Sequence, residues 1–106
     1  MTVTVEMQKL RKGLDDRKIA WKDVSNDSDS CWICRTHFEI NNNFWSVVHG
    51  FNTYGGISIW QDVDYGLLEL MTSELNGGEP VGFLTAEDVL KEIDRIKKGG
   101  AENGEH

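Results

Sequence analysis

The chain has 106 residues, of which 39% are hydrophobic and 27% charged, and its formal net charge at pH 7 is −7. This length accommodates one domain with one hydrophobic core. The acidic balance argues against direct binding of DNA or RNA, because such binding needs clustered Lys and Arg to displace the counterions of the phosphates. The excess of carboxylates instead favours a solvated surface that keeps the protein in solution.

The sequence predicts a cytoplasmic protein that does not enter a membrane. No apolar run approaches the roughly 20 residues that span a bilayer. The first residues lack the basic and apolar regions of a secretory signal peptide. Two cysteines, Cys31 and Cys34, are too few for a disulfide framework, so reduced thiols are expected.

The first predicted element is a helix over residues 4–17. Its apolar residues Met7, Leu10 and Leu14 recur at helical spacing, so they share one face. Apolar and polar residues then alternate over residues 19–24, which indicates a short strand.

A β-hairpin is predicted over residues 31–51. Alternate residues of its first strand, 31–40, form an apolar side that consists of Trp32, Cys34, Thr36, Phe38 and Ile40. Residues 41–43 are all asparagine and form the predicted turn, because asparagine tolerates left-handed backbone dihedral angles. The second strand is predicted over residues 44–51.

The register of this hairpin depends on the length of its turn. A three-residue loop would pair Ile40 with Phe44 and place Phe44 and Val48 in the core. One face would then carry Arg35, His37, Glu39, Trp45, Val47 and His49. A shift of one residue would reverse this grouping, so the register is treated as open.

The segment after the hairpin is predicted to complete the sheet and then to form a helix. Residues 52–56 read as a turn and residues 57–60 as the third strand of a meander. Asp62 or Asp64 would cap the helix that follows. A helix over residues 65–75 is favoured by the spacing of Leu67, Leu68, Met71 and Leu75, and a strand over residues 67–71 is the competing interpretation.

The last part of the chain is predicted as a short strand and a helix. Residues 80–84 form the strand, and the pattern from Thr85 to Asp88 resembles a capping box at the start of the helix. Gly99 and Gly100 are predicted to end it. The fold class is therefore α+β: an antiparallel β-meander with an N-terminal, a C-terminal and a middle helix packed on the sheet. Residues 1–98 form the single domain, and residues 99–106 a flexible tail.

One face of the predicted hairpin carries groups that could bind a small anionic or aromatic ligand. An indole or phenol would stack on a ring, Arg35 and a histidine would meet an anion, and two glycines would offer backbone N–H groups. The alternative is a sheet face covered by a helix, with the histidines satisfied locally. The predicted ligand-binding residues are Arg35, His37, Trp45, His49, Tyr54, Gly55 and Gly56.

Metal, cofactor and catalytic sites are not predicted. Cys31 and Cys34 have odd spacing in a strand, which sends the two thiols to opposite faces and argues against both zinc binding and a redox pair. Ser46 and Ser58 lie outside any nucleophile-elbow pattern. A non-enzymatic protein without a cofactor is therefore expected.

Four segments together resemble a known group of proteins. These are residues 45–50, 53–56, 66–71 and 76–89. The combination is similar to a group of small unannotated proteins of bacteriophages and mobile elements of gut bacteria, for which no activity is established. The resemblance implies a phage accessory protein, and such proteins often act by stoichiometric binding.

The first functional hypothesis is a phage or mobile-element accessory protein that binds and inhibits a host protein of a defence system. The contact would be an acidic surface made by Asp62, Asp64, Glu69, Glu74 and Glu79. The alternative is a binding protein, or sponge, for a small ligand or signalling nucleotide, which uses the region of Trp45, His49 and Tyr54 to Gly56. Eight of the ten aromatic residues fall between Trp32 and Tyr65, which is compatible with a homodimer.

Overall fold

The computed structural model describes residues 3–26, 32–58 and 61–103 of the chain. Within these residues it contains two α-helices, seven strands and one short 3₁₀ turn. In chain order the elements are α1 (Val5–Asp16), β1 (Trp21–Asp23), β2 (Ile33–Ile40), β3 (Asn43–Gly50), β4 (Ile57–Ser58), β5 (Val63–Asp64), β6 (Leu68–Thr72), the 3₁₀ turn (Asn76–Gly78), β7 (Val81–Leu84) and α2 (Ala86–Asn103).

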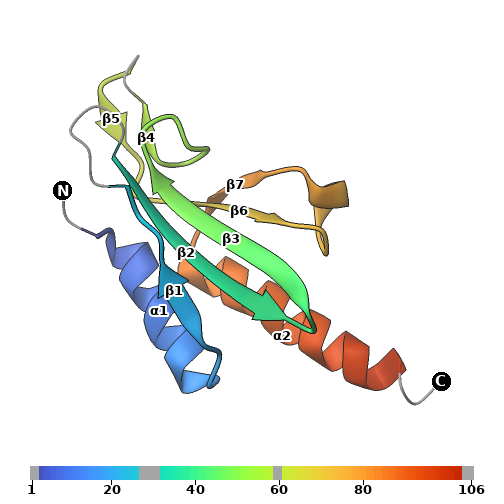
Figure 1. The fold of residues 1–106 in the computed structure, drawn as a ribbon. Helices are drawn as coiled ribbons and strands as arrows, with labels where there is room; N and C mark the ends of the chain where they lie inside the picture. The colour runs from blue at the N-terminus through green and yellow to red at the C-terminus, as the bar shows by residue number, and fades with distance from the viewer. Residues whose placement is uncertain (1–2, 27–31, 59–60, 104–106) are drawn as a thin grey trace.

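The main sheet has the strand order β1-β2-β3-β6-β7, and each neighbouring pair is antiparallel. Both helices lie on the same side of this sheet, and the hydrophobic core fills the space between the two layers (Figure 1). Strands β4 and β5 form a separate small sheet at one end. The predicted α+β class and the two terminal helices are confirmed. Among the described residues no helix combines the length and hydrophobicity of a membrane-spanning segment.

Helix α1 packs as its apolar spacing predicts. Met7, Leu10 and Leu14 are fully buried against the sheet and α2. Gly13 is also buried at the contact with α2, where an added Cβ would lie 2.4 Å from Cδ1 of Leu90. The helix-to-helix contact therefore depends on the small volume of this glycine.

The C-terminal end of α1 is held by backbone and side-chain contacts. The Ile19 N–H donates to the Leu14 carbonyl at 2.9 Å, and Lys18 between them has φ 58°. This is the arrangement of a Schellman motif, in which glycine is the usual residue at positive φ. Arg17 binds the Asp94 carboxylate of α2 through Nε at 2.8 Å and Nη2 at 2.7 Å, and this hydrogen bonding lowers the pKa of Asp94.

The predicted register of the central hairpin is wrong by one residue. Ile40 pairs with Asn43, so the loop contains only Asn41 and Asn42, with φ 52° and 68°. Two residues at positive φ form the type I′ turn, whose twist matches that of antiparallel strands. Consequently Trp45 lies opposite Phe38, on the helix-covered side of the sheet.

This shift reverses the expected burial along β3. Trp45, Val47 and His49 are buried on the core side with Thr36 and Cys34. The prediction that places Phe44 in the core is wrong, whereas Val48 is buried but on the other side of the sheet from Trp45. Phe44 is 50% exposed on the opposite face, and Val48 is buried there beside Arg35.

The chain after β3 also departs from the prediction. Strand β4 pairs with β5 instead of extending the meander, and residues 59–60 of the predicted third strand lie outside the described residues. The predicted middle helix is wrong, because β6 takes the place beside β3. Its residues Leu68, Leu70 and Thr72 alternate into the core, and this strand pairing outweighs the helical spacing. Neither Asp62 nor Asp64 therefore caps a helix.

Helix α2 begins as predicted and ends later. The Asp88 N–H donates to Thr85 Oγ1 at 3.1 Å and the Thr85 N–H to Asp88 Oδ2 at 3.0 Å, which confirms the capping box. The predicted end at Gly99 and Gly100 is wrong, since the helix continues to Asn103. Glycine lowers helix stability by about 1 kcal/mol relative to alanine but does not forbid the conformation. Residues 104–106 of the predicted tail lie outside the described residues.

The observed register makes a prediction for two adjacent aromatic residues. Trp45→Ala should lower the free energy of unfolding by about 3–5 kcal/mol, because the indole is fully buried. Phe44→Ala should lower it by less than about 1 kcal/mol, because half of the ring is in solvent. Urea denaturation of both variants measures the difference, and the opposite ranking would contradict the register.

Candidate functional site

The observed register divides the predicted ligand-binding residues between two faces of the sheet. Trp45 and His49 are 0% and 1% exposed and lie in the core. Arg35 and His37 lie on the opposite face, which no helix covers. The predicted shared face of these four residues is therefore wrong, because a two-residue turn and not a three-residue turn joins the strands.

The side chain of His49 binds a carboxylate from the small sheet. Its Nε2 lies 2.8 Å from Oδ1 of Asp64, and its ring packs edge-on against Trp32. The same Asp64 oxygen accepts the Gly66 N–H at 2.8 Å. Burial alone would raise the pKa of Asp64, but the hydrogen bonds from His49 and Gly66 outweigh it and lower that pKa. The pair thus joins the β5 segment to the end of β3.

Backbone groups of the turn from Tyr54 to Gly56 form hydrogen bonds with other segments of the fold. The Tyr54 carbonyl accepts the Phe83 N–H at 3.1 Å, and the Gly55 carbonyl accepts the Leu67 N–H at 2.9 Å. Gly55 has φ +93°, and an added Cβ would lie 2.7 Å from the Phe83 nitrogen. Gly55 thus allows β7 to approach the turn, whereas a Cβ on Gly56 would meet Thr53 and Gly50. Both glycines are buried, while Tyr54 is exposed.

The predicted acidic residues are spread along the length of β3. Asp64 lies near His49 at the end of β3, whereas Glu74 hydrogen-bonds to Asn43 at its start. Six residues of strand separate these points, which corresponds to about 20 Å. Glu69 accepts the Tyr54 N–H at 2.9 Å. Three of the five carboxylates therefore have partners within the fold, and the remaining two, Asp62 and Glu79, are exposed.

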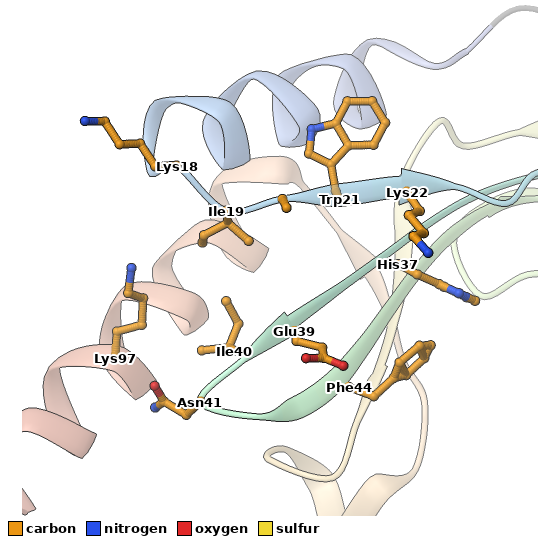
Figure 2. A pocket seen from close by; sticks show the side chains of 11 residues that line it. Lys18, Ile19, Trp21, Lys22, His37, Glu39, Ile40, Asn41, Phe44 and Lys97 are labelled. Carbon is orange, nitrogen blue, oxygen red and sulfur yellow. The ribbon is translucent and has the colours of Figure 1, made fainter.

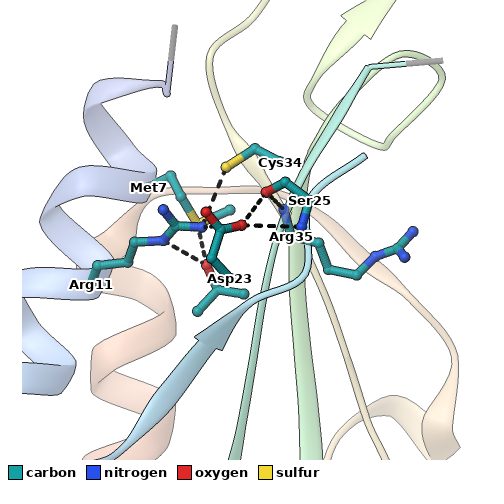
Figure 3. Close-up of polar contacts among 7 residues, drawn as sticks. Met7, Arg11, Asp23, Ser25, Cys34 and Arg35 are labelled. Carbon is teal, nitrogen blue, oxygen red and sulfur yellow. Dashed lines mark hydrogen bonds and ion pairs between the residues drawn. The ribbon is translucent and has the colours of Figure 1, made fainter. Parts of the chain in front are cut away.

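A cluster of polar groups surrounds the buried thiol of Cys34 (Figure 3). Arg11 from α1 donates through Nε to Thr36 Oγ1 at 2.9 Å, and its Nη2 lies 3.6 Å from Cys34 Sγ and 3.4 Å from Asp23 Oδ1. The Arg11 guanidinium also stacks over the Trp21 ring at 4.7 Å. These contacts join α1 to β1 and β2. Cys31, the other predicted thiol, lies outside the described residues.

The uncovered side of the sheet is the candidate functional surface. We call it the open face and define it by Ile33, Arg35, His37, Phe44, Ser46, Val48, Glu69 and Met71. Two rows cross its three central strands. One row is Arg35, Val48 and Glu69, and the other is His37, Ser46 and Met71.

The open face combines exposed apolar groups with opposite charges. Phe44 is 50% and Met71 46% exposed, and a shallow depression of about 420 Å³ lies between them and neighbouring residues. Arg35 has no carboxylate within 4.0 Å among the described residues. Burial and then the charge of Arg35 lower the pKa of His37, so its ring is neutral at pH 7. The open face therefore combines exposed apolar side chains with an arginine that has no ion pair among the described residues.

The sequence contains a signal for the open face, which the prediction of a three-residue loop missed. Two consecutive asparagines suit the type I′ turn, and that turn alone would have assigned Phe44 to the outside. Met71 was missed because its segment was assigned to a helix. Among the described residues no group of three or more His, Cys, Asp or Glu could hold a metal ion.

Comparison of the chain with protein-family models, with curated proteins and with solved structures finds no match. The resemblance to phage and mobile-element proteins therefore stays a prediction. The open face is defined by geometry alone.

The contact between His49 and Asp64 predicts a pH-dependent contribution to stability. Because the pKa of Asp64 is lower in the folded than in the unfolded protein, this contribution is complete above about pH 4 and is lost as pH falls through the folded value. Asp64→Asn should lower the free energy of unfolding by about 1 kcal/mol at pH 7, since the carboxylate is half exposed.

Denaturation curves between pH 2 and pH 7 measure this effect. The difference between the unchanged protein and the Asp64→Asn variant should shrink towards the acid end. Asp62→Asn is the matched control, because Asp62 is exposed and its positive φ suits asparagine. Equal losses in the two variants would contradict a specific role for Asp64.

Proposed function

We propose that this chain is a non-enzymatic binding protein that engages a partner protein stoichiometrically through the open face. The observation that carries the proposal is the half-exposed pair Phe44 and Met71 on a sheet face without a helix. Arg35 lies on the same face and has no ion pair within the part of the chain that the structure describes. Exposed apolar side chains that lie close together on a surface are typical of protein interfaces, in which arginine is also enriched.

The arrangement of charges defines the chemistry of the partner surface. Arg35 and Glu69 lie on opposite sides of Val48 in one row across the strands. A complementary surface has an apolar centre, a carboxylate that meets Arg35 and a cation that meets Glu69. Charges at the border of an apolar contact determine orientation and partner choice more than affinity.

The resemblance to phage and mobile-element proteins suggests that the partner is a host protein, such as one of a defence system. The open face supports this function better than the predicted acidic surface does. The acidic residues lie at both ends of β3, and three of them have partners within the fold. The contact surface is therefore proposed to be apolar with a charged border.

The test compares a surface variant with a matched control. The double variant Phe44→Ser and Met71→Ser removes the apolar centre and should fold, because both side chains are about half in solvent. Phe83→Asn removes an aromatic ring that is 57% exposed on β7, and asparagine tolerates its positive φ. Each tagged protein is used to capture partners from a lysate of a gut bacterium.

The expected result is a protein recovered at about one copy per chain by the unchanged protein and by Phe83→Asn but not by the double variant. No recovery, or equal recovery by the double variant, would overturn the proposal. Light scattering of the purified protein tests whether a second copy of the chain, and not a different protein, binds the open face. A dimer that the double variant abolishes would assign the open face to a second copy of the chain and would also overturn it.

A further inference from the structure

A notch at the edge of the sheet is separate from most of the open face. Strand β1 ends its pairing at Trp21 and Phe38, while β2 continues to Ile40. The chain before β1 turns away towards α1, so the edge of β2 is uncovered at this corner. A cavity of about 780 Å³ lies there, with Ile19 and Ile40 among its walls (Figure 2).

Three lysines from the two ends of the chain line this notch. Lys18 follows α1, Lys22 lies on β1, and Lys97 lies near the end of α2. The carboxylate among the lining residues is that of Glu39, which is exposed. The cavity therefore concentrates positive charge in a chain whose formal net charge is −7.

These lysines differ from most other cations of the described chain. Six Lys and Arg residues form ion pairs within 4.0 Å, namely Lys9, Arg11, Lys12, Arg17, Lys91 and Arg95. None of the three notch lysines has such a partner among the described residues. Asp94, one turn before Lys97, accepts hydrogen bonds from Nε and Nη2 of Arg17, and the more distant charge of Lys97 contributes least to the lowered pKa of Asp94. The notch thus holds ammonium groups that are available to a ligand.

The conformation of Lys18 is a second unusual feature. It has φ 58° at the end of α1, where glycine is the favoured residue. A lysine there strains the backbone, and no ion pair with another described residue offsets the cost. Residues in a backbone conformation that their type disfavours are expected at functional sites. This position also offers a substitution that removes the charge and relieves the strain.

The two ends of the notch have different chemistry. Lys18 and Lys97 project at one end, while Phe44 and His37 lie at the other near Lys22 (Figure 2). The rings of Phe44 and His37 pack edge-on with their centroids 4.6 Å apart, and half of the Phe44 side chain is exposed. A planar ring can stack at this end, and phosphate oxygens can meet ammonium groups at the other.

We propose that the notch is a binding site for an organic phosphate that carries a planar ring, of the class of nucleoside phosphates. Lys18 and Lys97 bind the phosphates, Phe44 supports the ring, and Lys22 adds positive charge beside it. This site goes beyond the proposed protein interface and shares only His37 and Phe44 with the open face. It differs from the ligand site predicted from the sequence, whose Trp45 and His49 are buried.

Calorimetric titration at constant ionic strength tests the site with ADP as the probe and adenosine as its uncharged analogue. ADP should bind at least about tenfold more tightly than adenosine, because hydrogen bonds to charged groups are lost without the phosphates. Lys18→Gly and Lys97→Gln should each weaken ADP binding by about tenfold. Lys18→Gly should melt at or above the temperature of the unchanged protein, so its loss of binding would not reflect unfolding.

Lys12→Gln is the charge-matched control, since Lys12 is exposed, belongs to an ion pair on α1 and does not line the notch. It should change ADP affinity by less than about twofold. Absence of ADP binding, or an equal loss in Lys12→Gln and Lys97→Gln, would overturn the proposal. All three lysine variants keep Phe44 and Met71, so partner capture by the open face is measured independently.

Discussion

The turn of two asparagines between β2 and β3 is the constraint on which the rest of the structure depends. With Asn41 and Asn42 both at positive φ, Ile40 pairs with Asn43, and every later side chain of β3 is assigned to a face. Trp45 stacks on Phe38 beneath the sheet, and its fully buried indole anchors the core. Because side chains alternate along a strand, the same turn directs Phe44 to the opposite side and creates the open face.

The end of β3 shows why residues that resemble a ligand site belong to the fold. His49 is buried with Asp64 as its partner, and Gly55 admits the backbone of β7 at short distance. These contacts connect the small β4–β5 sheet and β7 to the central strand. An imidazole, a carboxylate and glycines are also the groups of many active sites, but here each one satisfies a neighbour within the protein.

The two proposed sites use different consequences of the same architecture. The open face exists because both helices pack on one side of the sheet, which leaves Met71 and Phe44 in solvent. The notch exists because β1 is shorter than β2, so lysines around that corner surround a cavity. The first site suits an apolar protein surface, and the second suits a phosphate, although the chain as a whole is acidic.

The sequence by itself determined the elements whose signals are local. The helical spacing of Met7, Leu10 and Leu14, the alternation along β2 and the capping box of Thr85 were sufficient for α1, β2 and the start of α2. Tertiary structure decided the rest. The segment of β6 fits a helix or a strand, and only its pairing with β3 selects the strand. The notch likewise required the fold, because residues about 80 positions apart, such as Lys18 and Lys97, become neighbours only when α1 and α2 pack side by side.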